Sequence, residues 1–284
     1  MPAENHTVNP SFNITTENTP LNKPNLFITA GKQGISFILS DTDSNTFISV
    51  LVYHFAKHLT ATAIANQINE IVSNKNLSQQ HFKKIFVTWC FDENVLVPQD
   101  FFDASNCNEM LELVYGDLMP GAVQTELVTT HNLHTVYKIP AAVKNIFNNH
   151  FPFCIQNHQS SLLINFEKNN KDLLYCNFYP EHLTVMLRKN GQLQVIQQFE
   201  YASPEDAVYH LLNVCQSFET DAAKTILTVS GMIDTDSNLY SELYKYFQSV
   251  NCTDLPADFN YAEEIKGYPK HYFSHLFATA SCVL

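Results

Sequence analysis

Arginine is almost absent from this 284-residue chain, in which Arg188 is the only one. Charged residues make up 15% of the sequence, against about a quarter in average proteins. The formal net charge is −12. Because phosphate backbones are held mainly by dense lysine and arginine, this composition argues against direct nucleic-acid binding. Asn, Gln, Ser and Thr replace the missing charges, so we expect a neutral, polar surface.

Long apolar runs are missing as well. No stretch approaches the roughly 18 apolar residues that a membrane helix needs, and the N-terminal region carries no apolar core of a secretory signal. The seven cysteines include no Cys-x-x-Cys pair, so they form no local metal or redox motif and suggest no disulfide framework. We therefore expect a cytoplasmic protein, without membrane insertion, whose cysteines are reduced and mostly buried.

Signature motifs of common enzymes are also lacking. There is no Gly-x-Ser-x-Gly elbow, Walker loop or Rossmann glycine fingerprint. The string "DTDSN" occurs at 41–45 and 234–238, but neither copy has the Gly at position six and Glu at position twelve of a calcium loop. We interpret both copies as Asx turns or helix caps. His271 and His275 have a spacing that can hold a metal on a helix, but we interpret them as part of a partly exposed helix face. We predict no metal and no cofactor.

The order of predicted elements repeats along the chain. Residues 1–25, with four prolines, predict a disordered or loosely docked tail. Each half then reads as a three-stranded meander, a helix, a buried strand and a helix. This repeat divides the chain into a first lobe over 26–150 and a second lobe over 151–284. The first lobe has strands predicted over 26–30, 35–39, 47–55 and 83–91, with a helix over 59–74.

The second lobe has the sharper local signals. Asn190-Gly191 predicts a hairpin turn inside a meander over 172–201. Ser203 and Pro204 predict the start of a helix. A buried strand over 224–231 and helices over 236–250 and 271–283 are expected after it. In the first lobe, the segment 114–126 carries Gly116, Pro120 and Gly121 and predicts a shaped loop, which we interpret as a plain connection, with a partner contact as the alternative.

Three strings carry a resemblance to a known family. They are "VLVPQDFF", "TELVTTHNLHTVYKIP" and the block that runs from "YCNFYPEHL" to "AVYHLLN". Over roughly residues 25 to 284, the chain resembles an uncharacterised family of Bacteroidetes proteins, a domain of unknown function, with an actin-like ATPase fold. The resemblance implies an α/β protein with mixed α+β sheets, in which a duplicated actin-like (ribonuclease H-like) unit forms two lobes. Each lobe would hold a β-meander, helices and parallel strands.

The resemblance also implies where a nucleotide would bind. Nucleotide-binding actin-like proteins carry an acidic residue followed by glycine at the first hairpin turn of each half, and a glycine pair after a late buried strand. Here the first turn, "TAGKQG", offers Lys32 and Gly34 but no carboxylate. The second turn, "NFYPEH", offers only Glu181, and the late strand ends at the single Gly231. If a nucleotide binds, these four residues are the candidate contacts.

We therefore expect a non-catalytic actin-like binding or scaffold protein of unknown specific role, whose partner is another protein. The alternative is a divergent nucleotide-binding ATPase or phosphotransferase that uses the cleft between the lobes. An accessory role in ribosomal-RNA modification, through protein contact, is a third hypothesis.

Overall fold

The structure is a computed structural model, and it describes residues 8–16, 23–118, 120–166 and 172–284. The chain separates into two compact units. The first unit comprises Met1–Ser161 and Phe259–Gly267, and the second comprises Leu162–Asp258 and Tyr268–Leu284. The sequence placed one boundary at residue 150. The observed division instead falls inside a helix, and a late segment returns to the first unit.

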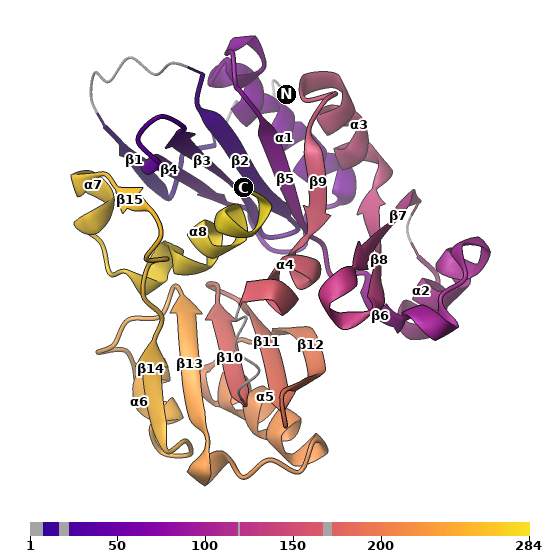
Figure 1. Cartoon of the computed structure of the whole chain (residues 1–284), viewed down its shortest axis with the longest axis vertical. Coiled ribbons are helices and arrows are strands. Elements are labelled where there is room, and N and C mark those ends of the chain that lie inside the picture. The colour runs from indigo at the N-terminus through magenta and orange to yellow at the C-terminus, as the bar shows by residue number, and fades with distance from the viewer. Residues whose placement is uncertain (1–7, 17–22, 119, 167–171) are drawn as a thin grey trace, which may run out of the picture. The chain divides into compact units, whose positions relative to one another are not determined.

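The first unit is built on a seven-stranded mixed sheet of strand order β1-β4-β3-β2-β5-β9, with β15 paired to β4 (Figure 1). The predicted meander forms β2, β3 and β4, and β5 and β9 continue it in parallel with β2. The strands are β1 (Phe12–Thr15), β2 (Asn25–Gly31), β3 (Gly34–Asp41), β4 (Thr46–His54), β5 (Ile85–Cys90), β9 (Ile155–His158) and β15 (Asn260–Tyr261).

Helices α1 (Ala61–Asn74) and α3 (Ala141–His150) belong to the same core as this sheet. Helix α1 buries Ile64, Ile68 and Ile71, the stripe that its sequence predicts, because residues three and four apart share one helix face. Its first turn is capped by Thr60, whose Oγ1 accepts a hydrogen bond from the Ala63 amide at 3.2 Å. Trp89, predicted to lie in the core, is fully buried there.

A three-stranded antiparallel sheet of order β6-β8-β7 completes the first unit, together with helix α2. The loop predicted over 114–126 is wrong in its second part, because β7 begins at Gly121. An antiparallel register with β8 pairs Gly121 with Pro140 and draws this segment into the sheet. The elements are β6 (Asn94–Pro98), α2 (Cys107–Tyr115), β7 (Gly121–Val128), β8 (Leu133–Pro140) and the short helix α7 (Glu263–Lys266).

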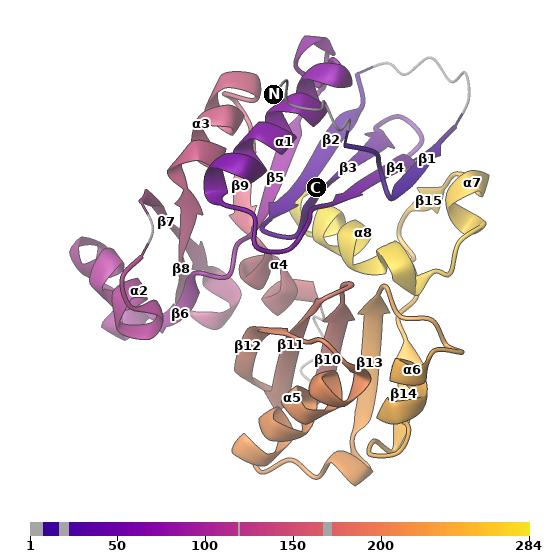
Figure 2. The same ribbon diagram turned by 180° about the vertical axis from the view of Figure 1, so that it is seen from behind.

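The second unit holds a five-stranded mixed sheet of order β12-β11-β10-β13-β14 (Figure 2). Strands β11 and β12 of the meander are joined by a turn at Asn190 and Gly191. These two residues have φ of 55° and 74°, as a type I′ hairpin turn requires. Helix α5 starts with the predicted Ser203, whose Oγ accepts from the Asp206 amide at 3.2 Å. The strands are β10 (Leu173–Phe178), β11 (His182–Lys189), β12 (Gln192–Glu200), β13 (Ile226–Gly231) and β14 (Ser249–Cys252), and the helices are α5 (Pro204–Ser217), α6 (Asn238–Leu243) and α8 (His271–Val283).

The long helix predicted over 236–250 is wrong. The observed α6 ends at Leu243, and the chain continues into β14, which pairs in parallel with β13. Val250 is buried in this strand, so a long-range strand pairing takes the residues that local periodicity assigned to a helix. Helix α4 (Gln159–Phe166) and strand β9 were not predicted, and α4 contains the division between the units.

Both sheets therefore run through a meander and then two parallel strands, in the same order. This shared order is what the repeated element order in the sequence leads us to expect. The predicted tail over 1–25 contains β1, which pairs antiparallel with β4 from Phe12 to Thr15. The remainder of that tail lies largely outside the described residues.

Candidate functional site

The first candidate turn joins β2 to β3 at the end of the sheet where the parallel strands β2, β5 and β9 finish, here called the carboxyl edge. Lys32 lies in this turn, and its Nζ is 3.5 Å from a carboxylate oxygen of Asp92. Both side chains are partly exposed, at 38% and 44%. Asp92 follows β5, which runs parallel to β2 and ends beside Gly31. The structure thus brings a carboxylate to a turn that has none of its own.

The glycines of this turn are required by packing between strands. A Cβ added to Gly34 would lie 2.2 Å from the Tyr53 carbonyl oxygen, and one added to Gly31 would lie 2.6 Å from the Cys90 carbonyl oxygen. Since real Cβ atoms do not approach backbone so closely, any side chain here would push the neighbouring strand away. Close contact between strands therefore accounts for both glycines.

A buried histidine, His158, lies at the carboxyl end of β9. The His158 ring is fully buried, and its Nε2 donates to the Phe91 carbonyl at 3.1 Å while Nδ1 accepts from the Ser160 amide at 3.2 Å. Burial lowers the pKa of His158 to about 4. The imidazole is therefore neutral near pH 7, and both of its nitrogens already have protein partners.

Glu126 reaches this edge from β7. One of its carboxylate oxygens accepts from the His158 amide at 2.9 Å, and the other accepts from the Asn157 side chain at 2.5 Å. The carboxylate thereby ties the three-stranded sheet to the end of β9. Both carboxylate oxygens of Glu126 accept hydrogen bonds from the protein itself, so we interpret Glu126 as a residue that holds the end of β9 in place.

The second candidate turn joins β10 to β11 and contains Glu181, which is partly buried. Gly231 ends β13 and pairs in parallel with Phe178, the last residue of β10, so both candidates belong to the same edge of the second sheet. Gly231 has a φ of 82°, and an added Cβ would lie 2.1 Å from the Phe178 carbonyl oxygen. Both the backbone conformation and the close strand contact therefore require glycine.

Helix α8 packs on β13 next to this edge. The Ser230 Oγ lies 2.7 Å from the Ser274 Oγ and 3.5 Å from the His275 Nδ1. Ser274 is linked in turn to Thr253 at 2.5 Å. Burial, with a smaller contribution from the neighbouring His182, lowers the pKa of His275 to about 3. This cluster is therefore built from neutral hydroxyl and imidazole groups.

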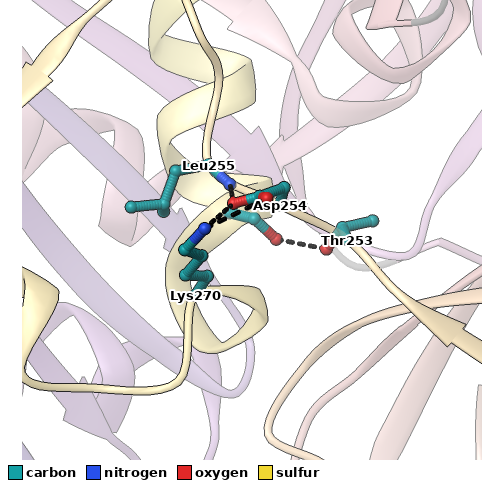
Figure 3. A network of polar contacts seen from close by, with 5 residues as sticks. Thr253, Asp254, Leu255 and Lys270 are labelled. Atoms are coloured by element: carbon teal, nitrogen blue, oxygen red, sulfur yellow. Dashed lines mark hydrogen bonds and ion pairs between the residues drawn. The ribbon is translucent and has the colours of Figure 1, made fainter.

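The start of α8 is fastened to the end of β14 by a charged pair (Figure 3). The Lys270 Nζ lies 3.0 Å from an oxygen of Asp254, and that carboxylate also accepts from the Leu255 amide at 2.8 Å. Hydrogen bonds from Lys270 and Leu255 lower the pKa of Asp254. The pair is exposed, so its contribution is a local tether rather than a large stabilisation.

Two buried polar side chains at the same edge have no hydrogen-bond partner among the residues that the structure describes. Asn177 is fully buried with both amide atoms unpartnered, and the hydroxyl of Thr184, 1% exposed, is unpartnered too. The two residues lie opposite each other in the β10–β11 pair, so they share a face of the sheet. Buried groups of this kind reduce stability unless they are satisfied.

Three comparisons place the chain among known proteins. The sequence of residues 13–250 matches the family described as "Protein of unknown function (DUF3822)". The chain belongs to the DUF3822 family. No curated protein matches this DUF3822 chain.

Solved structures give the fold of this DUF3822 protein. One is a Bacteroides thetaiotaomicron protein with actin-like ATPase fold and unknown function, at a TM-score of 0.71 and 16% identity, covering 86% of this chain and 94% of that one. Another belongs to the PilM-PilN type IV pilus biogenesis complex, at a TM-score of 0.57 and 9% identity, covering 93% of this chain and 100% of that one. The α/β class with an actin-like ATPase fold is confirmed.

The remaining motifs of the DUF3822 chain have structural explanations. Asp41 accepts from the amides of Asp43 and Ser44 at 3.3 Å, and Ser237 caps α6, as an Asx turn and a helix cap were predicted for the two "DTDSN" copies. His271 and His275 are 7% and 6% exposed, so the partly exposed helix face expected for them is wrong. The His271 Nε2 donates to the Ile233 carbonyl at 2.8 Å. Packing of α8 on β13 buries both rings.

Within the described ranges, no group of three or more His, Cys, Asp or Glu side chains is arranged to hold a metal ion. The seven cysteines all lie in these ranges, and each is free of disulfide bonding. No described helix combines the length and apolar character needed to cross a membrane.

Asp92 is the residue that the sequence analysis missed at the first turn. The signal was present in "CFDE", where Asp92 and Glu93 directly follow a buried strand. Carboxyl ends of parallel strands meet at one edge of a sheet, so acidic residues at that point lie near the other strand ends. Recognising it required knowing that β5 pairs with β2.

Proposed function

We propose that this protein is a non-catalytic, actin-like binding or scaffold protein whose partner is another protein. The observation that carries the proposal is the use of the candidate phosphate turns for internal packing. Gly34 and Gly231 both face neighbouring backbone at distances that leave no room for a Cβ. A nucleotide site needs glycines that expose bare amides to phosphate. Here the glycines permit strands to approach each other.

The backbone after Gly231 supports the same proposal. The Met232 amide donates to the Phe178 carbonyl at 2.7 Å, and the Ile233 amide donates to the Gly231 carbonyl at 3.0 Å. These amides already have partners within the unit. The electrostatics of this cluster also support the proposal, because Ser230, Ser274 and the neutral His275 offer no positive group to a phosphate.

A role in protein contact is supported by apolar side chains on and before α2. Leu113 is 88% exposed, Val114 is 61% exposed, and Phe101, shortly before the helix, is 76% exposed. Leu113 and Val114 are adjacent in the chain, and exposed apolar surface of this kind can mark a site that a partner covers. A related fold supports the same kind of role, since PilM is found in the PilM-PilN complex.

Partner capture by variants of α2 tests this proposal. We expect Leu113→Glu to reduce recovery of the natural partner from cells that produce the protein by at least about tenfold, because it places a charge where the partner would cover an apolar side chain. Asn108→Glu is the matched control, since it adds the same charge to an exposed position of the same helix. Equal recovery by wild type, Leu113→Glu and Asn108→Glu would contradict a partner on this helix.

One observation favours the alternative, a divergent nucleotide-binding ATPase or phosphotransferase. Asp92 lies beside Lys32 at the first turn, and a carboxylate there could organise a metal ion near a phosphate held by the lysine. Glu181 and Gly231 are the other two contacts that the sequence proposed for this alternative. This alternative predicts ligand binding that the scaffold proposal does not.

Thermal unfolding with Mg-ATP separates the two functions. A ligand present at one hundred times its dissociation constant adds about 2.7 kcal/mol to the free energy of unfolding. Under our proposal, millimolar Mg-ATP leaves the melting temperature unchanged. The alternative requires stabilisation that Lys32→Ala removes and that the exposed-lysine control Lys83→Ala retains.

A further inference from the structure

Strand β12 is an edge strand of the sheet in the second unit. Strand β12 pairs with β11 along its length, and no other described strand pairs with its outer side (Figure 1). It runs for nine residues, Gln192–Glu200, whereas the opposite edge strand, β14, has four. The outer row of backbone N–H and C=O groups on such a strand is a template for another strand.

The sequence of β12 carries little of the usual protection for an edge. Natural edge strands are blunted by lysine, proline, bulges or inward-pointing charges. "QLQVIQQFE" has no lysine, arginine or proline, and its single charge, Glu200, is at the last position. One irregularity lies near its start, where Leu187 pairs with Val195 but Arg188 pairs with Leu193, leaving Gln194 as the extra residue. The stretch from Val195 to Glu200 is regular.

That regular stretch is self-complementary in an antiparallel register. A two-fold axis perpendicular to the sheet keeps each side chain on its own face, so it can place Gln197 opposite itself. Val195 then lies opposite Phe199, and Ile196 lies opposite Gln198. Val195 and Phe199 both pack against the core of the unit, so their pairing would extend an existing apolar row.

We propose that β12 pairs antiparallel with β12 of a second copy of this chain, centred on Gln197, to form a dimer with a continuous sheet. The neutral edge favours this occupant, because a chain of net charge −12 meets its copy here without opposing two like charges directly. Gln197 is exposed on the edge, and its amide can donate to and accept from its counterpart. Pairing at β12 depends neither on a partner at α2 nor on nucleotide binding.

The register makes opposite predictions for two variants of one strand. Gln197→Lys places two ammonium groups directly across the axis, and we expect it to weaken the dimer roughly tenfold or more, since like charges opposite each other are unfavourable. Gln194→Lys adds its charge outside the regular stretch and away from the axis, so it should leave the dimer intact. Both variants add the same charge to the same edge, so each is the control of the other.

Sedimentation velocity of the full chain over a concentration series measures this. Support consists of a wild-type dimer that Gln197→Lys dissociates and Gln194→Lys preserves. A wild type that stays monomeric overturns the proposal and leaves the edge to a strand of a different protein. A dimer that survives Gln197→Lys, or that both variants weaken equally, also overturns it.

Cross-linking gives a second readout that does not depend on charge. Opposed residues of antiparallel strands have Cα atoms about 4.5 to 5.5 Å apart, which is within the range that a disulfide spans. Under mild oxidation, Gln197→Cys should form a covalent dimer on a non-reducing gel in higher yield than wild type, whose exposed Cys282 sets the background. Equal yields from the two proteins would count against the pairing.

Discussion

The carboxyl edges of the two large sheets can be compared residue by residue, because the sheets share one strand order. At the first edge, His158 uses both ring nitrogens and Glu126 binds two donors. At the second, Asn177 and Thr184 have no hydrogen-bond partner in the described part of the chain. The same topology therefore holds a hydrogen-bonded edge in one unit and an incompletely satisfied edge in the other. Strand order alone does not determine the chemistry of this edge.

The largest expected effect tests the strand contact at the second edge. Gly231→Ala would put a Cβ on a residue with positive φ, 2.1 Å from the Phe178 carbonyl oxygen. We therefore expect the free energy of unfolding to fall by roughly 2 to 5 kcal/mol. Urea unfolding followed by far-UV circular dichroism measures it. Trp89, the single tryptophan, lies in the core of the first unit. The unfolding midpoint followed by its fluorescence should therefore shift less than the midpoint followed by circular dichroism.

Gly116→Ala is the control for this substitution. Gly116 also has a positive φ, 74°, but its added Cβ would meet nothing within 4 Å. We therefore expect only the backbone penalty, roughly 1 to 3 kcal/mol. If Gly231→Ala were no more destabilising than Gly116→Ala, the close contact between β10 and β13 would be refuted.

An intermediate effect should appear in acid, because each edge buries a neutral histidine. Burial lowers the pKa of His158 to about 4 and that of His275 to about 3. In the unfolded chain both rings take up protons near pH 6.5, so the stability present above this pH is lost as the pH falls. The slope is about 1.4 kcal/mol per pH unit for each histidine. Below pH 4 only His275, in the second unit, should continue to lower the free energy of unfolding as the pH falls.

Imidazole NMR signals recorded between pH 7 and 5 check this prediction, together with urea unfolding over the same range. We expect two rings that remain neutral throughout while the free energy of unfolding decreases. Titration of all twelve histidines near pH 6.5 would show that His158 and His275 are not buried as described.

The smallest effect contrasts two buried threonines. Thr135 Oγ1 accepts a hydrogen bond from Ser161 at 2.8 Å in the first unit, whereas Thr184 in the second has no partner within the described ranges. Thr135→Val should lower the free energy of unfolding by roughly 0.5 to 1.5 kcal/mol, because it removes this buried hydrogen bond. Thr184→Val should be neutral or stabilising by up to about 1 kcal/mol. Chemical denaturation of the two isosteric variants measures the difference. A clear loss for Thr184→Val would reveal a partner for that hydroxyl, such as bound water.

Much of the fold was predictable where local patterns act alone. The stripe of Ile64, Ile68 and Ile71 predicted α1, and Ser203 predicted the start of α5. Asn190 and Gly191 predicted their hairpin turn. Each of these signals involves residues within one or two turns of the chain, so no distant segment can override it easily.

Short parallel strands were the parts that the sequence did not reveal. Strands β9 and β14 have four residues each, and each is held by pairing with one distant strand. The tyrosine-rich segment before β14 was predicted as one long helix, because its spacing also fits a helix. At the candidate site, Lys32 and Gly34 were visible in sequence, but Asp92 was not, since it reaches Lys32 only through the pairing of β5 with β2.

The sequence by itself determined which segments form the meanders and the longer helices, because hydrophobic period, caps and turn residues act over a few residues. Only the tertiary structure decided that Gly231 lets β10 and β13 approach closely. It also decided that His271 and His275 are buried and that Asp92 lies beside Lys32. These features depend on which distant strands and helices pack together. That choice is made by the whole core, whose stability is the sum of contacts from across a unit.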